Sequence, residues 1–65
     1  MWDPQAFRTA RVNAGLTQTE LARRLKVSQT AISRWELGTA PHVSLLCSAA
    51  RVLGVNAADF LGAKR

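Results

Sequence analysis

The stretch over residues 17–38 constrains the fold more than any other part of the chain, because it holds two helix starts with very little sequence between them. Thr17 and Glu20 have the spacing of a capping box, in which each side chain bonds the backbone N–H of the other residue. A helix should therefore begin directly after Thr17. Ser28 is a second favourable N-cap and opens another helix. Residues 26–27 then have room only for a sharp turn.

Both helices carry apolar side chains at helical spacing, so each has one face suited to a core. Leu21 and Leu25 lie on this face of the first helix, and Ile32 and Trp35 lie on that of the second. Ala22 is small enough to let the second helix cross closely over the first. Two short helices packed at a steep angle form a helix-turn-helix, whose second helix enters the major groove of DNA.

Capping residues and glycines predict the remaining helices. Asp3 and Pro4 form a helix start, a capping acid followed by proline at the first helical position. Gly15 is a suitable end to that helix, and Asn56 is predicted to cap a last short one. No segment alternates as a strand does. We therefore expect an all-α fold of five helices, at about residues 4–14, 18–25, 29–37, 44–53 and 57–61.

The expected core combines the inward faces of these helices. In the helix over residues 44–53 the apolar positions recur at i, i+3, i+4 and i+7, with Val43 one turn before them. Cys47 is also expected in the core, as a small apolar side chain. The residues predicted to be largely buried are Phe7, Leu16, Leu21, Ala22, Leu25, Ile32, Trp35, Leu46, Ala50, Leu53 and Phe60.

Composition limits both the class of protein and the class of partner. The chain has 65 residues, of which 48% are hydrophobic, so it fits one globular domain rather than a disordered segment. Nine basic against four acidic side chains give a net charge of +5, which favours a polyanionic partner. The single cysteine cannot form an internal disulfide and fits a reducing cytoplasm. Because no apolar run approaches the ~20 residues that span a bilayer, no membrane partner is expected.

The sequence holds no recognisable catalytic or metal-binding set. His42 and Cys47 are the only candidate pair of soft ligands, whereas a structural zinc site takes four. No Ser/His/Asp arrangement or paired carboxylates on one helix face are visible. The sequence therefore predicts no metal, no cofactor and no enzymatic activity.

Motifs along nearly the whole chain, from Phe7 to Leu61, support a more specific assignment. They are Phe7-x-x-x-Arg11, Gly15-Leu16-Thr17-Gln18, Glu20-Leu21-Ala22, Val27-Ser28, Ile32-Ser33, Trp35-Glu36-x-Gly38, Pro41 and Leu53-Gly54-Val55. With these motifs the chain resembles the Cro and phage-repressor type of helix-turn-helix, the xenobiotic-response-element family. The resemblance implies a five-helix, lambda-repressor-like domain. One position departs from the family pattern: Lys26 stands where a glycine is usual, because the backbone there tends to be left-handed. A non-glycine residue in that conformation costs on the order of 1 kcal/mol.

Several polar residues are candidates for contact with DNA. Gln29 opens the second helix of the motif, and a glutamine can bond adenine N6 and N7 together. Gln18 begins a helix whose free N–H groups suit a phosphate, and the resemblance implies that it also braces Gln29. For Arg34, base reading and phosphate pairing both remain open. The residues expected at the DNA are Gln18, Arg23, Ser28, Gln29, Thr30, Ser33, Arg34, Thr39 and His42.

The resemblance also implies structural contacts. Arg11 and Glu36 are expected to form a partly buried ion pair, with DNA contact as the alternative. A homodimer is implied, and its surface is expected around the last helix and the loop before it. Trp2 either covers the core beside helix 4–14 or lies at the dimer contact. The residues predicted at that contact are Val55, Ala58, Phe60 and Leu61.

The expected function is sequence-specific binding of double-stranded DNA by a homodimeric transcriptional regulator. Repression from a pseudo-palindromic operator is the simplest form of that function. A bacterial or phage origin, with the protein on the nucleoid in the cytoplasm, fits the resemblance. The alternative is an antitoxin-like or coactivator-like protein-interaction module of the same fold, but Gln18, Gln29 and Arg34 favour DNA.

Overall fold

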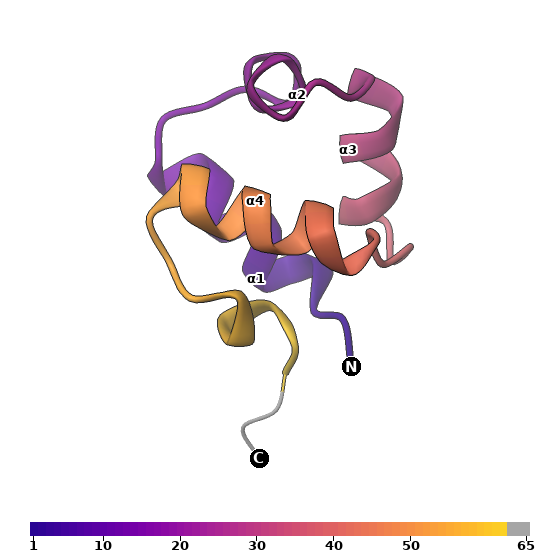
Figure 1. Cartoon of the computed structure of the whole chain (residues 1–65), viewed down its shortest axis with the longest axis vertical. Coiled ribbons are helices and arrows are strands. Elements are labelled where there is room, and N and C mark those ends of the chain that lie inside the picture. The colour runs from indigo at the N-terminus through magenta and orange to yellow at the C-terminus, as the bar shows by residue number, and fades with distance from the viewer. Residues whose placement is uncertain (63–65) are drawn as a thin grey trace.

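The computed structural model describes residues 1–62, and all regular structure in that range is helical (Figure 1). The elements are α1 (Pro4–Asn13), α2 (Gln18–Leu25), α3 (Gln29–Glu36), α4 (Val43–Leu53) and a 3-10 helix, η1 (Ala57–Phe60). Helix α2 packs against α3 and α4, while α1 lies against α3 and η1. The predicted all-α class is therefore confirmed for the part of the chain that the structure describes. Within that part, no helix has the length and apolar character needed to cross a membrane.

The capping residues read from the sequence start the first three helices as predicted. Asp3 accepts a hydrogen bond from the backbone of Ala6, and Ser28 does the same for Ala31, in both cases over 3.1 Å. In α2 the Thr17 backbone N–H donates to Glu20 Oε1 over 2.8 Å, and the Glu20 N–H donates to Thr17 Oγ1 over 3.0 Å. The capping box is therefore complete.

The bond from the Thr17 backbone N–H to the Glu20 carboxylate makes the start of α2 dependent on pH. The hydrogen bond from the Thr17 backbone, followed by that with its side chain, lowers the pKa of the Glu20 carboxyl below its ordinary value. A carboxyl with a lowered pKa in the folded state stabilises the fold while it is ionised. That contribution is present above the ordinary pKa of the group and is lost as the pH falls through the lowered one.

The turn between α2 and α3 has the left-handed backbone that the family pattern suggests. Lys26 has φ 59° and ψ 41°, the only positive φ outside glycine among the described residues. The N–H groups of Lys26 and Val27 donate to the carbonyls of Arg23 and Ala22. This is the Schellman arrangement, which closes a helix by bonding its last carbonyls. The conformation reverses the chain within two residues and so sets the angle of α3 against α2.

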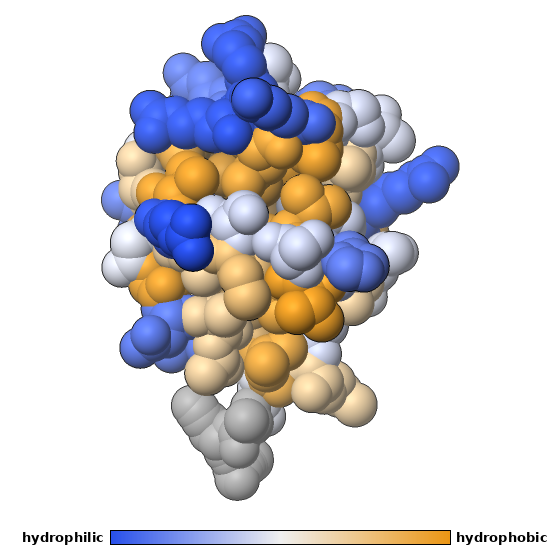
Figure 2. Space-filling view, viewed as in Figure 1, coloured by the Kyte–Doolittle hydropathy of each residue, from blue (hydrophilic) through white to orange (hydrophobic). Residues whose placement is uncertain are grey.

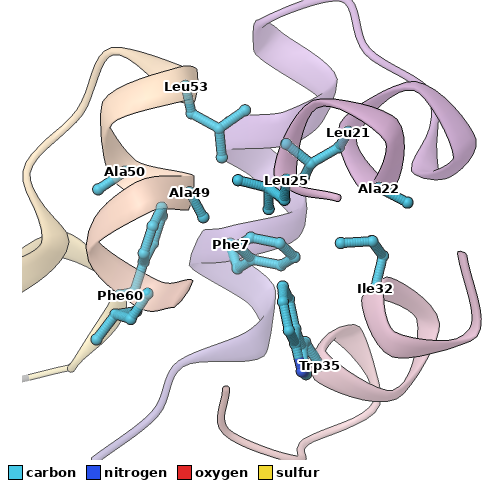
Figure 3. Packing of buried hydrophobic residues seen from close by; sticks show 11 residues of the cluster. Phe7, Leu21, Ala22, Leu25, Ile32, Trp35, Ala49, Ala50, Leu53 and Phe60 are labelled. Atoms are coloured by element: carbon cyan, nitrogen blue, oxygen red, sulfur yellow. The ribbon is translucent and has the colours of Figure 1, made fainter. Parts of the chain in front are cut away.

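The core is built around Phe7 of α1, which is fully buried (Figure 3). Its ring meets those of Trp35 and Phe60 edge-on, at centroid distances of 6.0 Å and 5.5 Å. Trp2 covers this group from the N-terminal side and donates its Nε1–H to the Trp35 carbonyl over 2.8 Å. Trp2 is therefore a core-covering residue. The buried hydrophobic residues are Phe7, Leu21, Ala22, Leu25, Ile32, Trp35, Leu46, Ala49, Ala50, Leu53 and Phe60.

The last helical element differs from the prediction. Residues 57–61 were expected to form an α-helix capped by Asn56, but η1 is a 3-10 helix that ends at Phe60. Its turns are closed by i→i+3 bonds, such as that from Asp59 N–H to the Asn56 carbonyl, and the Asn56 side chain makes no capping bond. Four residues are too few for a stable α-helical segment, whereas they suit a 3-10 turn. Over residues 1–62 the fold is thus four α-helices and one 3-10 helix, so the last of the five predicted helices is a 3-10 element.

The other differences concern single residues. Ala14 and Leu37 are the C-caps of α1 and α3 rather than their last helical residues, and α4 starts one residue early, at Val43. The predictions that Cys47 and Val43 belong to the core were wrong, since both side chains are exposed. The buried face of α4 consists of Leu46, Ala49, Ala50 and Leu53. Cys47 and Val43 lie outside this face. Leu16 packs against the core but is only partly buried.

Replacing Lys26 with glycine should stabilise the fold, because glycine adopts a left-handed backbone without steric cost. We expect the free energy of unfolding in urea to rise by about 1 kcal/mol, or the melting temperature by about 4–8 °C for a domain of this size. Lys26→Ala is the matched control. It removes the same charge but keeps a side chain at the strained position, so its stability should stay close to that of the original. A glycine variant no more stable than the alanine variant would contradict the prediction.

Candidate nucleic-acid interface

Helix α3 presents a polar face to solvent while its apolar face holds it to the core. The Ile32 and Trp35 side chains of α3 are buried, whereas those of Gln29 and Thr30 are exposed in its first turn. Ser33 is partly exposed, and Arg34 is exposed in the last turn. Hydrophilic side chains gather over α2 and the outer side of α3, and much of the surface over α4 and η1 is apolar (Figure 2). The exposed start of α3 is thus a polar surface on a rigid support.

A chain of hydrogen bonds connects this surface with α1. Gln29 Nε2 donates to Gln18 Oε1 over 2.5 Å, and Gln18 Nε2 donates to Glu36 Oε1 over 3.0 Å. On the far side of the carboxylate, Arg11 Nε donates to Glu36 Oε2 over 2.5 Å and its Nη2 donates to Oε1 over 3.3 Å. Arg11 Nη1 also reaches the Leu16 carbonyl over 2.8 Å. Three helices are therefore joined by one network of side chains.

The network fixes which way each amide points. A carboxylate can only accept hydrogen bonds, so the NH₂ group of Gln18 must face Glu36 and its oxygen must face Gln29. Gln29 then uses one N–H for Gln18 and has a second N–H and its carbonyl oxygen available. Those two groups are the donor and acceptor that adenine N7 and N6 require. The brace thus orients Gln29 while leaving one of its N–H groups and its carbonyl oxygen free.

The ion pair at the inner end of the network lies largely out of water. The side chains of Arg11 and Glu36 are 11% and 6% exposed. Every described buried side-chain nitrogen and oxygen has a hydrogen-bond partner. Such a pair is tolerated in a small core because the planar guanidinium meets the carboxylate with two parallel bonds. Arg11 donates hydrogen bonds to Glu36 and to the Leu16 carbonyl within the protein. The structure therefore supports its structural role rather than the DNA-contact alternative.

The start of α2, beside this network, has backbone N–H groups without an acceptor in the helix. The capping box takes up the N–H of Glu20, and the next N–H, that of Leu21, bonds the Thr17 carbonyl. The N–H groups of Gln18 and Thr19 have no acceptor within the helix and point out from its positive end. Backbone N–H groups of this kind bind phosphate without regard to base sequence.

The other residues expected to contact DNA lie outside the hydrogen-bonded network. Arg23 is exposed in the last turn of α2, and Thr39 is exposed in the loop after α3. Ser28 caps α3, and His42 caps α4, where its Nδ1 accepts a bond from the Ser44 N–H over 3.2 Å. That bond requires the ring proton on Nε2. DNA contact by these four residues remains a prediction.

The sequence matches the helix-turn-helix family over residues 7–60. The chain belongs to this family, in its Cro and repressor type. Among solved structures it is similar to the crystal structure of the hypothetical transcription factor NHTF from Neisseria, with a TM-score of 0.80 and 34% sequence identity. The match covers 89% of this chain and 68% of that chain. A comparison with curated proteins gives no match.

One charged residue of this helix-turn-helix domain was missed by the sequence analysis. Arg8 of α1 approaches Glu36, with 3.9 Å between Arg8 Nε and Glu36 Oε1. The only sequence signal is that Arg8 lies three residues before Arg11 and therefore on a neighbouring part of the same helix surface. Its closeness to the Gln18–Gln29 pair depends on how α1 packs against α3.

The residues predicted at a dimer contact are only partly available in the helix-turn-helix domain. Phe60 is fully buried and fills a core position, so it has no surface to offer a second copy. Ala58 is exposed, and Val55 and Leu61 are partly exposed. A dimer contact at this end of the domain would therefore rest on these three residues.

Replacing Glu36 with glutamine should be strongly destabilising, because it leaves the buried Arg11 guanidinium without its counter-charge. Breaking a buried pair from one side costs several kcal/mol, and we expect roughly 3 kcal/mol less free energy of unfolding in urea. Asp59→Asn is the control: it makes the same change of charge at an exposed position and should shift stability by no more than about 0.5 kcal/mol. Equal stabilities for the two variants would show that the ion pair contributes little to the fold.

Proposed function

We propose that this helix-turn-helix protein, a DNA-binding regulator of transcription, is a repressor that binds a pseudo-palindromic operator as a homodimer. Helix α3 of each copy would lie in a major groove, with its first turn toward the base edges. Half-sites would then be about 34–36 Å apart, one turn of duplex. Occupation of such a site would block access of polymerase to a promoter.

The observation that carries the proposal is the braced Gln29. It is exposed at the start of α3, held by Gln18 over 2.5 Å, and presents the donor and acceptor that match adenine. A residue held in this way loses little side-chain freedom on binding, so more of the base contact appears as affinity. An exposed glutamine fixed in that orientation favours base reading over a protein-interaction module.

The surrounding charges support the same proposal. The free N–H groups at the start of α2 and the exposed Arg23 suit phosphates on either side of a groove. The net charge of +5 supplies the attraction to DNA that does not depend on sequence. The solved Neisseria protein, 34% identical, is itself described as a hypothetical transcription factor.

The proposal is tested by selecting bound sites from a random library of DNA duplexes. We expect an inverted repeat whose half-sites are separated by about one helical turn, each with an adenine that cannot be exchanged. A single unpaired site would contradict the homodimer, and unselective recovery of all sequences would contradict base reading. Failure to retain any DNA would favour the interaction-module alternative.

Gln29→Ala should weaken binding to the selected site by roughly 1–3 kcal/mol and relax the preference at one base pair of each half-site. Binding to random-sequence DNA, and its dependence on salt, should hardly change because no charge is lost. Arg23→Ala should behave in the opposite way if its side chain meets a phosphate, weakening both DNAs alike and reducing the salt slope by about one unit. Affinity measured against salt on both DNAs distinguishes the two. An equal loss on both DNAs for Gln29→Ala would make Gln29 a positioning residue.

A further inference from the structure

Arg8 is the one cation in the described part of the chain that contacts the Glu36 network from outside. Its side chain is 59% exposed, whereas that of Glu36 is 6% exposed. The separation of 3.9 Å between Arg8 Nε and Glu36 Oε1 is at the limit of an ion pair and exceeds hydrogen-bond distance. Arg8 thus lies near the carboxylate while more than half of its side-chain surface remains exposed to solvent.

The carboxylate does not need Arg8. Arg11 donates to both oxygens of Glu36, and Gln18 donates to Oε1 as well. The charges of Arg11 and Glu36 cancel, so Arg8 gives the cluster a net charge of +1 at a point where water can reach it. A cation with no bond to give up can pair with an arriving anion at little cost.

The position of Arg8 relates it to the start of α2. Glu36 Oε1 lies 3.0 Å from Gln18 Nε2 and 3.9 Å from Arg8 Nε. Those two distances set an upper limit of about 7 Å between the Arg8 and Gln18 nitrogens. Arg8 therefore lies close to the residue that begins α2, whose free N–H groups would face a DNA strand.

We propose that Arg8 binds a backbone phosphate of the DNA, so that the interface extends from α2 and α3 onto α1. This inference rests on the proposed function, because it adds a contact to the same DNA complex. The guanidinium matches two phosphate oxygens with its parallel N–H groups. A phosphate contact carries no base preference, so Arg8 would add affinity and fix the register of α3 without reading sequence. The buried Arg11, although it lies in a family motif, keeps its donors on Glu36 and Leu16.

The test compares three variants on the selected duplex and on a random-sequence duplex over a range of salt. Arg8→Gln should weaken both DNAs by the same factor and make the plot of log affinity against log salt shallower by about 0.9. Arg8→Lys should keep the slope, because it keeps the charge. Arg51→Gln is the matched control, since Arg51 is also exposed but lies in the last turn of α4. It should leave the slope unchanged.

Each other outcome overturns the inference. An unchanged slope for Arg8→Gln would mean that Arg8 meets no phosphate. A loss confined to the selected duplex, together with a lower melting temperature, would mean that Arg8 supports Glu36 and thereby Gln29. Equal slope changes for Arg8→Gln and Arg51→Gln would reduce the effect to long-range charge. The unsubstituted protein and Gln29→Ala are measured alongside, and loss of selectivity in Gln29→Ala shows that the proposed function holds. If the unsubstituted protein binds neither duplex, the proposed function itself is refuted.

Discussion

The carboxylate of Glu36 accepts hydrogen bonds from Arg11 of α1 and from Gln18 of α2 while its own residue ends α3. Burying that charge in so small a domain is favourable only because both oxygens are satisfied and the Arg11 guanidinium supplies the opposite charge. The arrangement fixes where α1 and α2 meet the C-terminal end of α3. Gln29 is the first residue of α3, at its other end. The relative placement of three helices therefore depends on one group.

The same group connects the stability of the fold with the proposed recognition of DNA. Because the carboxylate only accepts, it determines the orientation of the Gln18 amide, and that amide determines the orientation of Gln29. In the proposed complex, base reading would begin from a side chain that is already ordered, on a helix held by Ile32 and Trp35 in the core. Sites held by a second layer of packed and hydrogen-bonded residues keep their geometry when the ligand arrives. In this protein that second layer is part of the fold itself.

The features that sequence predicted well are local ones. Thr17, Glu20 and Ser28 act within three residues of themselves, so their spacing was enough to predict where α2 and α3 begin. Cys47 was wrongly placed because its apolar character was given more weight than its position, which lies outside the i, i+3, i+4, i+7 face that is buried in α4. Phe60 could equally fill the core or meet a partner until the structure put it against Phe7. The closeness of Arg8 to Glu36 was not predicted, because the two residues are 28 positions apart in the sequence. Apart from the Arg11–Glu36 pair and the Gln18–Gln29 brace, which the family resemblance implied, side-chain contacts between helices thus need the tertiary structure, whereas the starts of the capped helices do not.

The central claim is that Gln18 and Gln29 act as one unit in reading DNA, and a double-mutant cycle on affinity tests it most directly. Gln18→Ala, Gln29→Ala and the double variant would be measured on the selected duplex and on random-sequence DNA. On the selected duplex we predict a coupling energy of about 0.5–3 kcal/mol, because removing Gln18 also releases Gln29 from its orientation. On random DNA the coupling should vanish. Losses on the selected duplex that add to within about 0.3 kcal/mol would contradict the account, since the two glutamines would then act independently.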